Sequence, residues 1–331
     1  MNKLFRTLFF VILTVVLFYG LDSVYTYIIK RDNFDKVWWM AKIENKNYDF
    51  ALIGASRVYA MVQTDTLENR WHKKGIDIAL DGSNIMEQYL ILKKFYSNHN
   101  TVKDLFVELD VINMGYKMNS DFRVWCFLPF IKDDESVYLE LGENFDQRRV
   151  FCWKYVPFYR YVDFNSKLGP ITILNAFMKF QKPPYTKTGD WQGKMLRSIN
   201  NENKNPDLPK KTAFMIVAKV QYDYLEKIMK LCDDNGTKVH LYTPPFYYNR
   251  FKVCRNFNEI LHDYIYPICT KHHADYRSFC EMDIAHNPAY FEDYLHINYF
   301  GLPFLTDSLV HSYNLDKHIA INHYPDTLAA K

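Results

Sequence analysis

Apolar residues along this chain fall into short runs that alternate with longer amphipathic stretches. The short runs predict strands at residues 49–53, 75–80, 102–109, 238–243 and 274–279, and helical periodicity predicts helices at residues 57–73, 85–96, 214–234, 256–272 and 299–313. Strands separated by helices of this length pair in parallel, because the chain must cross the sheet between them. The pattern therefore predicts an α/β fold of three layers (α/β/α), in which helices cover both faces of a mostly parallel sheet.

This alternation stops between the third and the fourth predicted strand. Residues 115–211 are rich in aromatic side chains, contain several prolines and show no clear period. We interpret them as an aromatic-rich insertion or cap that is partly helical, for example at residues 171–180, and that ends in a solvated loop at residues 200–211. Because the pattern resumes afterwards, we expect one domain over residues 48–331 that carries this insertion.

An apolar run near the N-terminus predicts a membrane-spanning helix. It occupies residues 8–21, follows Lys3 and Arg6, and continues in character at residues 24–29 beyond Asp22. A bilayer of ~30 Å needs about 20 residues, which the run supplies together with its extensions. A cleaved signal peptide has the same charge and core arrangement, but the residues before Asp22 are mostly bulky and form no small-x-small cleavage site. An uncleaved anchor over residues 1–30 is therefore favoured.

The basic residues before this run predict the orientation of the chain. Lys3 and Arg6 favour a cytoplasmic N-terminus, which places the rest of the chain on the periplasmic or cell-surface side. Residues 31–47, with Trp38 and Trp39, are expected to form an amphipathic linker helix at the membrane surface.

Composition narrows the class of protein further. Of 331 residues, 48% are apolar, which is enough for a sizeable core, and the net charge of +3 comes from scattered basic residues. Nucleic acid is therefore not an expected partner. The aromatic content of 17% predicts core packing, with a few sugar-stacking platforms as the alternative. None of the six cysteines forms a Cys-x-x-Cys pair, so no zinc site is expected, while disulfides and free buried thiols are equally open.

Two segments far apart in the sequence carry complementary chemistry. Ser56 follows the first strand at the point where a helix begins, and Asp293 precedes His296 by three residues. A hydroxyl, an imidazole and a carboxylate are the three parts of serine-based acyl transfer. Ser56 taken alone is typical of a helix N-cap. The Gly-x-Ser-x-Gly elbow of α/β-hydrolases is absent, because Val58 occupies the place of its second glycine.

A second aspartate and histidine have the same spacing. They are Asp283 and His286, and a Pro at position 288 follows them closely, as in a surface loop. His296 instead lies just before the apolar helix predicted at residues 299–313. We therefore select Asp293 and His296 as the candidate pair.

These segments together resemble the SGNH/GDSL hydrolase superfamily. The resemblance rests on Gly54-Ala55-Ser56-Arg57, on Asp81-Gly82-Ser83-Asn84 and on Asp293-x-x-His296-x-Asn298-x-x-Gly301, and it covers residues 48–113 and 212–313. It is strongest to the membrane-anchored, extracytoplasmic branch that is linked to acyl modification of cell-envelope polymers. The family implies a three-layer fold, a serine nucleophile, no cofactor and no metal.

The resemblance also implies a role for each matching residue. Ser56 matches the nucleophile, His296 the base and Asp293 the residue that orients it, while the amide of Gly82 would join that of Ser56 in binding the oxyanion. The chain departs from the family at Ala55, where aspartate is usual, and in the third block, which residues 108–113 replace. Two asparagines stand where the missing amide donor could come from, Asn84 and Asn113. Arg57 either attracts an anionic substrate or pairs with a carboxylate inside the fold.

The combined expectation is a membrane-anchored serine acyl esterase or O-acyltransferase. Its substrate would be an acylated envelope glycan or a similar ester, and a membrane-bound O-acyltransferase is the partner that family analogy implies. The alternative is a non-catalytic envelope scaffold or glycan-binding protein on the same fold, which the missing third block and the aromatic insertion favour. The sequence does not identify the acyl group, its acceptor or the oligomeric state.

Overall fold

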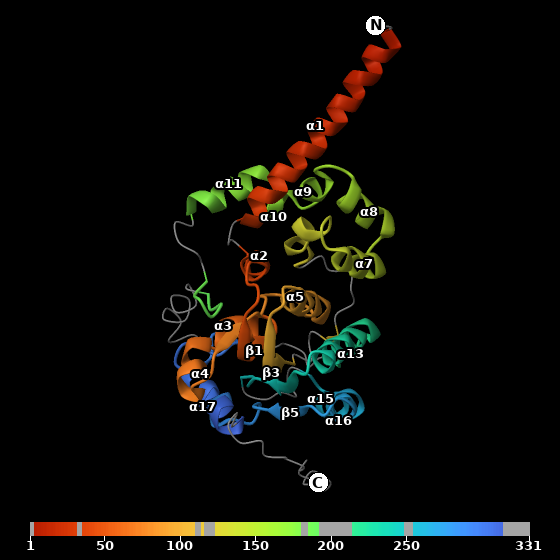
Figure 1. The fold of residues 1–331 in the computed structure, drawn as a ribbon. Helices are drawn as coiled ribbons and strands as arrows, with labels where there is room; N and C mark the ends of the chain where they lie inside the picture. Colours follow the sequence, from red (N-terminus) through yellow and green to blue (C-terminus); the bar gives the residue numbers. More distant parts are fainter. Residues whose placement is uncertain are drawn as a thin grey trace.

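A computed structural model describes residues 3–31, 35–109, 114–115, 123–179, 185–191, 214–247 and 254–313. Its centre is a parallel sheet of five strands (Figure 1). The strand order is β2-β1-β3-β4-β5, and every neighbouring pair is parallel. The strands are β1 (Asn47–Ile53), β2 (Gly75–Asp77), β3 (Thr101–Glu108), β4 (Lys238–Thr243) and β5 (Asp275–Ser278). The predicted parallel α/β fold is confirmed.

Successive residues of a strand point to opposite faces of the sheet. Since both faces carry apolar side chains here, helices pack on both of them. In β1, Ala51 and Ile53 belong to the core cluster that includes α5 (Ile85–Ser97), α13 (Lys219–Asp234) and α16 (Tyr266–Lys271). Phe50 and Leu52 face the other way. They pack into a second cluster formed with α3 (Ser56–Met61), α4 (Thr64–Trp71) and α17 (Leu302–Ser312). Both clusters are closed to solvent, which gives the three layers that the sequence predicts.

Several predicted elements differ from the observed ones at their boundaries. The helix expected at residues 57–73 is two helices, since Val62 between α3 and α4 has extended backbone angles. The helix expected at residues 256–272 contains a π-turn (Leu261–Ile265) between α15 (Phe257–Ile260) and α16. Pro267 follows this turn, and because proline has no N–H it cannot make the regular bond to the preceding turn. Helical periodicity does not report either break.

The connection between β3 and α13 spans the residues that the sequence pattern suggests are an insertion, and we refer to it by that name. Within the described residues it forms a group of short helices: η1 (Val124–Cys126), η2 (Leu128–Phe130), α7 (Glu135–Asn144), α8 (Gln147–Tyr155), α9 (Tyr159–Asp163), α10 (Asn165–Leu168) and α11 (Pro170–Lys179). The helix expected at residues 171–180 corresponds to α11. The loop expected at residues 200–211 lies outside the described residues. Two further short helices, η4 (Asp283–His286) and η5 (Pro288–Tyr290), precede α17.

A single helix, α1 (Lys3–Arg31), leaves the folded part of the molecule near the insertion (Figure 1). It is long and apolar enough to cross a membrane, and its N-terminal two-thirds are exposed. Its last third is different, because Asp22, Thr26 and Ile29 are buried against the rest of the chain. The helix therefore continues into the domain instead of ending at its surface.

The segment at residues 31–47 does contain a helix, but this helix does not lie on the surface of the domain as expected. The segment forms α2 (Lys36–Met40), which is part of the core: Trp38 is 1% exposed and its indole N–H donates to the carbonyl of Cys126 across 2.8 Å. Lys36 and Asp77 form a fully buried ion pair of 3.2 Å between α2 and β2. The two open alternatives for the cysteines are also decided, since all six are free thiols.

Candidate active site

Ser56 is the first residue of α3, immediately beyond the carboxyl end of β1. The chain turns tightly here because Gly54 lies against its neighbours: a Cβ at this position would be 2.4 Å from a methyl of Val58 and 2.7 Å from Cβ of Glu108. Only glycine fits such an approach without displacing the neighbouring strand. The turn leaves the Ser56 side chain partly exposed at the edge of the sheet.

The structure brings Ser56 and His296 into direct contact. Ser56 Oγ lies 2.8 Å from His296 Nε2, and His296 Nδ1 lies 2.8 Å from Oδ2 of Asp293. The predicted proximity of these three side chains is confirmed. Asp293 accepts the Nδ1 proton, so this network assigns the tautomer in which Nε2 can accept a hydrogen bond from the serine hydroxyl.

The carboxylate of Asp293 is held in its ionised form by its neighbours. Burial alone would raise its pKa, but hydrogen bonds from the His296 ring and from the amides of Leu295 and His296 outweigh this, so the pKa lies below its ordinary value of 3.8. The amide bonds measure 2.7 Å and 2.8 Å and fix the turn between the two side chains. The carboxylate is therefore charged and oriented before any substrate binds.

The loop that carries His296 is anchored by Asn298, whose side chain is completely buried. Its Nδ2 donates to the carbonyl of Ala289 across 2.7 Å, and its Oδ1 accepts the amide of Phe300 across 3.0 Å. Gly301 passes 2.7 Å from the carbonyl of Tyr290, measured from a Cβ built on it, so a larger residue does not fit. The spacing Asp-x-x-His-x-Asn-x-x-Gly thus encodes a rigid loop, and the side chain of Ser56 meets this loop at His296.

Glu108, at the end of β3, is a residue whose contribution sequence reasoning missed. It is 3% exposed, and its Oε2 accepts the backbone amide of Ala55 across 3.1 Å. The bond ties the end of β3 to the residue directly before Ser56. The available signal was a carboxylate directly after the apolar run Leu105-Phe106-Val107, because a charge at the end of a buried run needs a partner.

Arg57 is engaged inside the fold. It is 1% exposed, and its Nη2 donates to the carbonyls of Pro244 and Pro245 at 2.6 Å and 3.1 Å. Its guanidinium lies over the ring of Phe246 at 4.1 Å and reaches Glu108 at 3.9 Å. These contacts correspond to the structural alternative for Arg57, a partner for an internal carboxylate that joins α3 to the end of β4.

The loop after β2 lies next to the Ser56 turn. Ile78 and Leu80 extend the strand by donating to the carbonyls of Leu52 and Gly54, and the hydroxyl of Ser83 also donates to Gly54. Gly82, at the tip of this loop, has a φ of +68°. A Cβ added to it would meet nothing within 4 Å, so its surroundings are open.

Of the two asparagines considered as additional oxyanion donors, the structure describes only Asn84. Asn84 is the N-cap of α5: its side-chain oxygen accepts the amide of Glu87, while the Glu87 carboxylate accepts the amide of Asn84. The spacing Asn-x-x-Glu is the sequence signal of this capping box. Asn113 lies outside the described residues.

The candidate site occupies a favourable place in the sheet. In the order β2-β1-β3-β4-β5, the connections leave β1 and β3 in opposite directions, and ligands of such folds bind beyond the carboxyl ends of these strands. Ser56 follows β1 and Glu108 ends β3. The Ser56 hydroxyl thus lies at the edge of the sheet where ligands of such folds bind. In comparisons with known proteins, no family model and no curated protein matches the chain.

Proposed function

We propose that this chain is a membrane-anchored serine acyl esterase or O-acyltransferase with Ser56 as nucleophile, His296 as base and Asp293 as orienting acid. The observation that carries the proposal is the continuous hydrogen-bonded series from Ser56 Oγ through the imidazole to the carboxylate, with distances of 2.8 Å at each step. The resemblance to SGNH hydrolases at these same residues supports it.

The proposed reaction follows from the direction of these bonds. Ser56 Oγ attacks the ester carbonyl carbon while its proton passes to His296 Nε2, and the carbonyl π electrons move to oxygen. The collapsing intermediate expels the alcohol, which takes the proton from His296, and leaves an acyl group on Ser56. Water or a sugar hydroxyl then attacks the acyl carbon while its proton passes to His296 Nε2. When this second intermediate collapses, the bond to Ser56 Oγ breaks, Oγ recovers the proton from His296, and the acid or the new ester is released. Asp293 stabilises the imidazolium in both steps.

Two backbone amides are proposed to bind the oxyanion. Ser56 is the first residue of α3, where helix amides have no partner within the helix, and no side chain caps this end. Gly82 faces open surroundings at the tip of the neighbouring loop. Backbone donors fixed in this way act on the charge that develops in the transition state.

The apolar α1 and the resemblance to the envelope branch support an extracytoplasmic location. Within this proposal α1 is the anchor, the domain lies on the periplasmic or cell-surface side, and the substrate is an acylated envelope glycan or a similar ester. A membrane-bound O-acyltransferase would supply acyl groups in the transfer version of the reaction. Co-purification with such a protein tests that part separately.

A fluorophosphonate probe tests the central claim, since it reacts only with an activated serine. The full chain in detergent should be labelled, while Ser56→Ala and His296→Ala should not. His286→Ala is the matched control, because it removes a histidine with the same spacing from an aspartate in η4. Unlabelled wild type, or equal labelling of Ser56→Ala, overturns the proposal and favours a non-catalytic scaffold.

A further inference from the structure

The insertion exposes an unusual set of apolar side chains. They lie on α8, α9, α11 and the turn between α8 and α9, and we refer to them as the apolar patch. Its members are Phe151, Tyr155, Val156, Tyr159, Val162, Ile171, Leu174 and Met178, each between 36% and 76% exposed. Large apolar side chains gathered on the exposed side of neighbouring helices of a folded domain are typical of an interaction site.

The outer face of α11 shows that this exposure is specific to the insertion. Ile171, Leu174 and Met178 recur at spacings of three and four, so they share one face of the helix. On α13, the corresponding outer positions hold charged pairs such as Lys219 with Asp223 and Lys230 with Asp234. Helix α11 thus presents apolar side chains to the outside, as a helix does when it lies in a lipid interface.

The apolar patch is continuous with the surface of α1. Tyr19 donates its hydroxyl proton to the carbonyl of Tyr155 across 2.6 Å, and the rings of Phe18 and Phe158 are 6.4 Å apart. Further along α1, Tyr25 donates to the carbonyl of Leu168 across 2.7 Å. Helices α9, α10 and α11 of the insertion lie beside the C-terminal part of α1 (Figure 1), so the patch is next to the anchor.

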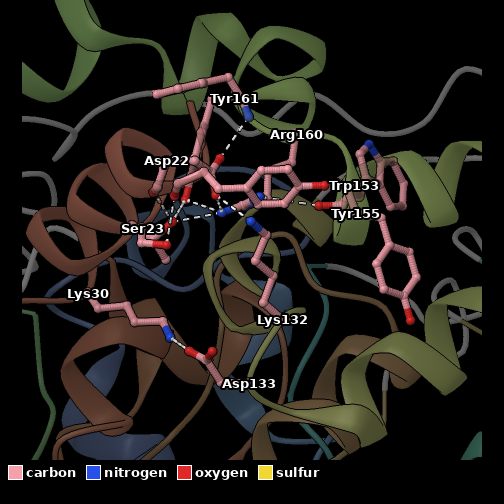
Figure 2. A network of polar contacts seen from close by, with 12 residues as sticks. Asp22, Ser23, Lys30, Lys132, Asp133, Trp153, Tyr155, Arg160 and Tyr161 are labelled. Carbon is pink, nitrogen blue, oxygen red and sulfur yellow. Dashed lines mark hydrogen bonds and ion pairs between the residues drawn. The ribbon is translucent and has the colours of Figure 1, made fainter. Parts of the chain in front are cut away.

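A buried ionic network fixes α1 against the insertion. Asp22, which is completely buried, accepts hydrogen bonds from Arg160 at 2.9 Å and from Lys132 at 2.6 Å (Figure 2). Its other oxygen accepts the amide of Phe158 across 2.7 Å. Since a buried charge of this kind holds its partners in place, the helix and the insertion have one fixed relative orientation.

The length of α1 places the apolar patch at the level of a membrane boundary. Residues 4–21 rise by about 27 Å at ~1.5 Å per residue, which is close to the ~30 Å of a hydrocarbon core. With this stretch in the bilayer, Tyr19 and the neighbouring Tyr155 lie at the boundary between lipid and water. Tyrosine is enriched at that depth because its ring is apolar and its hydroxyl polar.

We propose that the apolar patch is seated in the lipid interface around α1, so that the protein holds the bilayer by a spanning helix and by a surface. The proposal rests on the anchor described above and goes beyond it, because a simple tether would leave the domain free to turn. Seating the patch gives the domain, and with it the Ser56 site, one fixed orientation above the lipid. Lys167, exposed on α10 beside the patch, is then near the headgroups.

Site-specific labelling of the full chain tests this arrangement. In a Cys152→Ala background, which removes the one cysteine that is not buried, single cysteines replace Val162, Leu174, Phe304 or Ile12. Each is labelled with an environment-sensitive NBD dye and reconstituted into vesicles of phosphatidylethanolamine and phosphatidylglycerol. Quenching by doxyl-labelled phospholipid reports lipid contact, and quenching by iodide reports water.

The expected pattern separates the patch from the anchor. Labels at positions 162 and 174 should shift to shorter wavelength and be quenched by the doxyl lipid, as should the label at position 12 in α1. The label at position 304 in α17, an exposed apolar position in the other part of the fold, should be quenched by iodide alone. Lipid contact at position 12 with water contact at 162 and 174 overturns the proposal and favours a protein partner for the patch. Water contact at position 12 overturns the anchor itself.

Discussion

The carboxylate of Glu108 accepts the backbone amide of Ala55 across 3.1 Å, one residue before Ser56. It also faces the guanidinium of Arg57, one residue after Ser56, at 3.9 Å. Glu108, at the end of β3, therefore contacts the residue before Ser56 and the residue after it, and so fixes the backbone that carries the serine.

The two contacts of Glu108 predict one effect on the free energy of unfolding and another on the rate of labelling at Ser56. Glu108→Leu leaves Arg57 buried without its carboxylate, and we expect a loss of about 3–5 kcal/mol in the free energy of unfolding. The double variant Arg57→Met/Glu108→Leu should recover most of this loss, since it leaves no unpaired charge. It should still react slowly with the fluorophosphonate probe, because the Ala55 amide has lost its acceptor.

Denaturant unfolding and the labelling rate measure the two effects. Lys103→Met is the control: Lys103 pairs with Asp49 at the opposite ends of the same strands, but its side chain is 75% exposed. It should change stability by less than about 1 kcal/mol. A wild-type labelling rate in the double variant contradicts the positioning role of Glu108.

Gly82 and Gly236 offer a matched test of the proposed oxyanion site. Their φ values are +68° and +67°, and an added Cβ meets nothing within 4 Å at either position. Alanine at each should cost about 1–2 kcal/mol of stability through backbone strain alone. Only Gly82→Ala should also reduce the rate of ester hydrolysis, by about 10²–10³ if the strain displaces an oxyanion donor. Equal rates in the two variants would remove the Gly82 amide from the mechanism.

The sequence predicted the central sheet because its inner strands are largely buried on both faces. Such strands read as continuous apolar runs, and β1 and β4 were placed within two residues of their observed bounds. The position of Ser56 was also predictable, because it directly follows a parallel strand whose carboxyl end lies at the ligand-binding edge of the sheet. His296 is in the loop after η5, and its pairing with Ser56 was predicted from the complementary chemistry of the two side chains and from the resemblance. For the sheet, the apolar runs in the sequence and the observed strand arrangement therefore agree.

The parts that the sequence did not predict depend on tertiary partners. Trp38 in α2 has the local pattern of a surface helix, yet it is buried because the insertion folds over it, with Cys126 as its hydrogen-bond acceptor. Asp22 interrupts an apolar helix, which sequence reasoning treats only as a break in the membrane span. Its partners Arg160 and Lys132 are more than a hundred residues away, so no local pattern reports them.

Asp22 and Asp133 provide a matched pair for the network at α1 (Figure 2). Asp22 is fully buried between Arg160 and Lys132, whereas Asp133 pairs with Lys30 and has a side chain that is 69% exposed. Asp22→Ala should loosen the insertion strongly, at about 3–5 kcal/mol, because the buried Arg160 and the partly buried Lys132 lose their shared partner. Asp133→Ala should have an effect below about 1 kcal/mol.

Limited proteolysis of the two variants measures this difference. Faster cleavage within residues 147–168 is expected for Asp22→Ala, with wild-type cleavage for Asp133→Ala. If both variants are cleaved like the wild type, the network does not hold α1 against the insertion.

The surroundings of His240, on β4, predict that the stability of the fold depends on pH. Its Nδ1 lies 2.9 Å from Asp275 and its Nε2 lies 2.9 Å from Asp104, so both ring nitrogens face carboxylates. Burial alone would lower the pKa of the ring, but these two partners outweigh it and raise the pKa above 6.5. The charged imidazolium is thus stabilised by folding.

The sign of the effect follows from this direction. A pKa that is raised in the folded state contributes stability that is fully present below 6.5 and is lost as the pH rises through the folded value. Denaturant unfolding between about pH 6 and pH 9 should therefore show a decline that His240→Gln abolishes, since glutamine does not titrate in this range. His262→Gln is the control, because His262 is 84% exposed and should leave the decline unchanged. A wild-type pH profile in His240→Gln would show that another group is responsible for the decline.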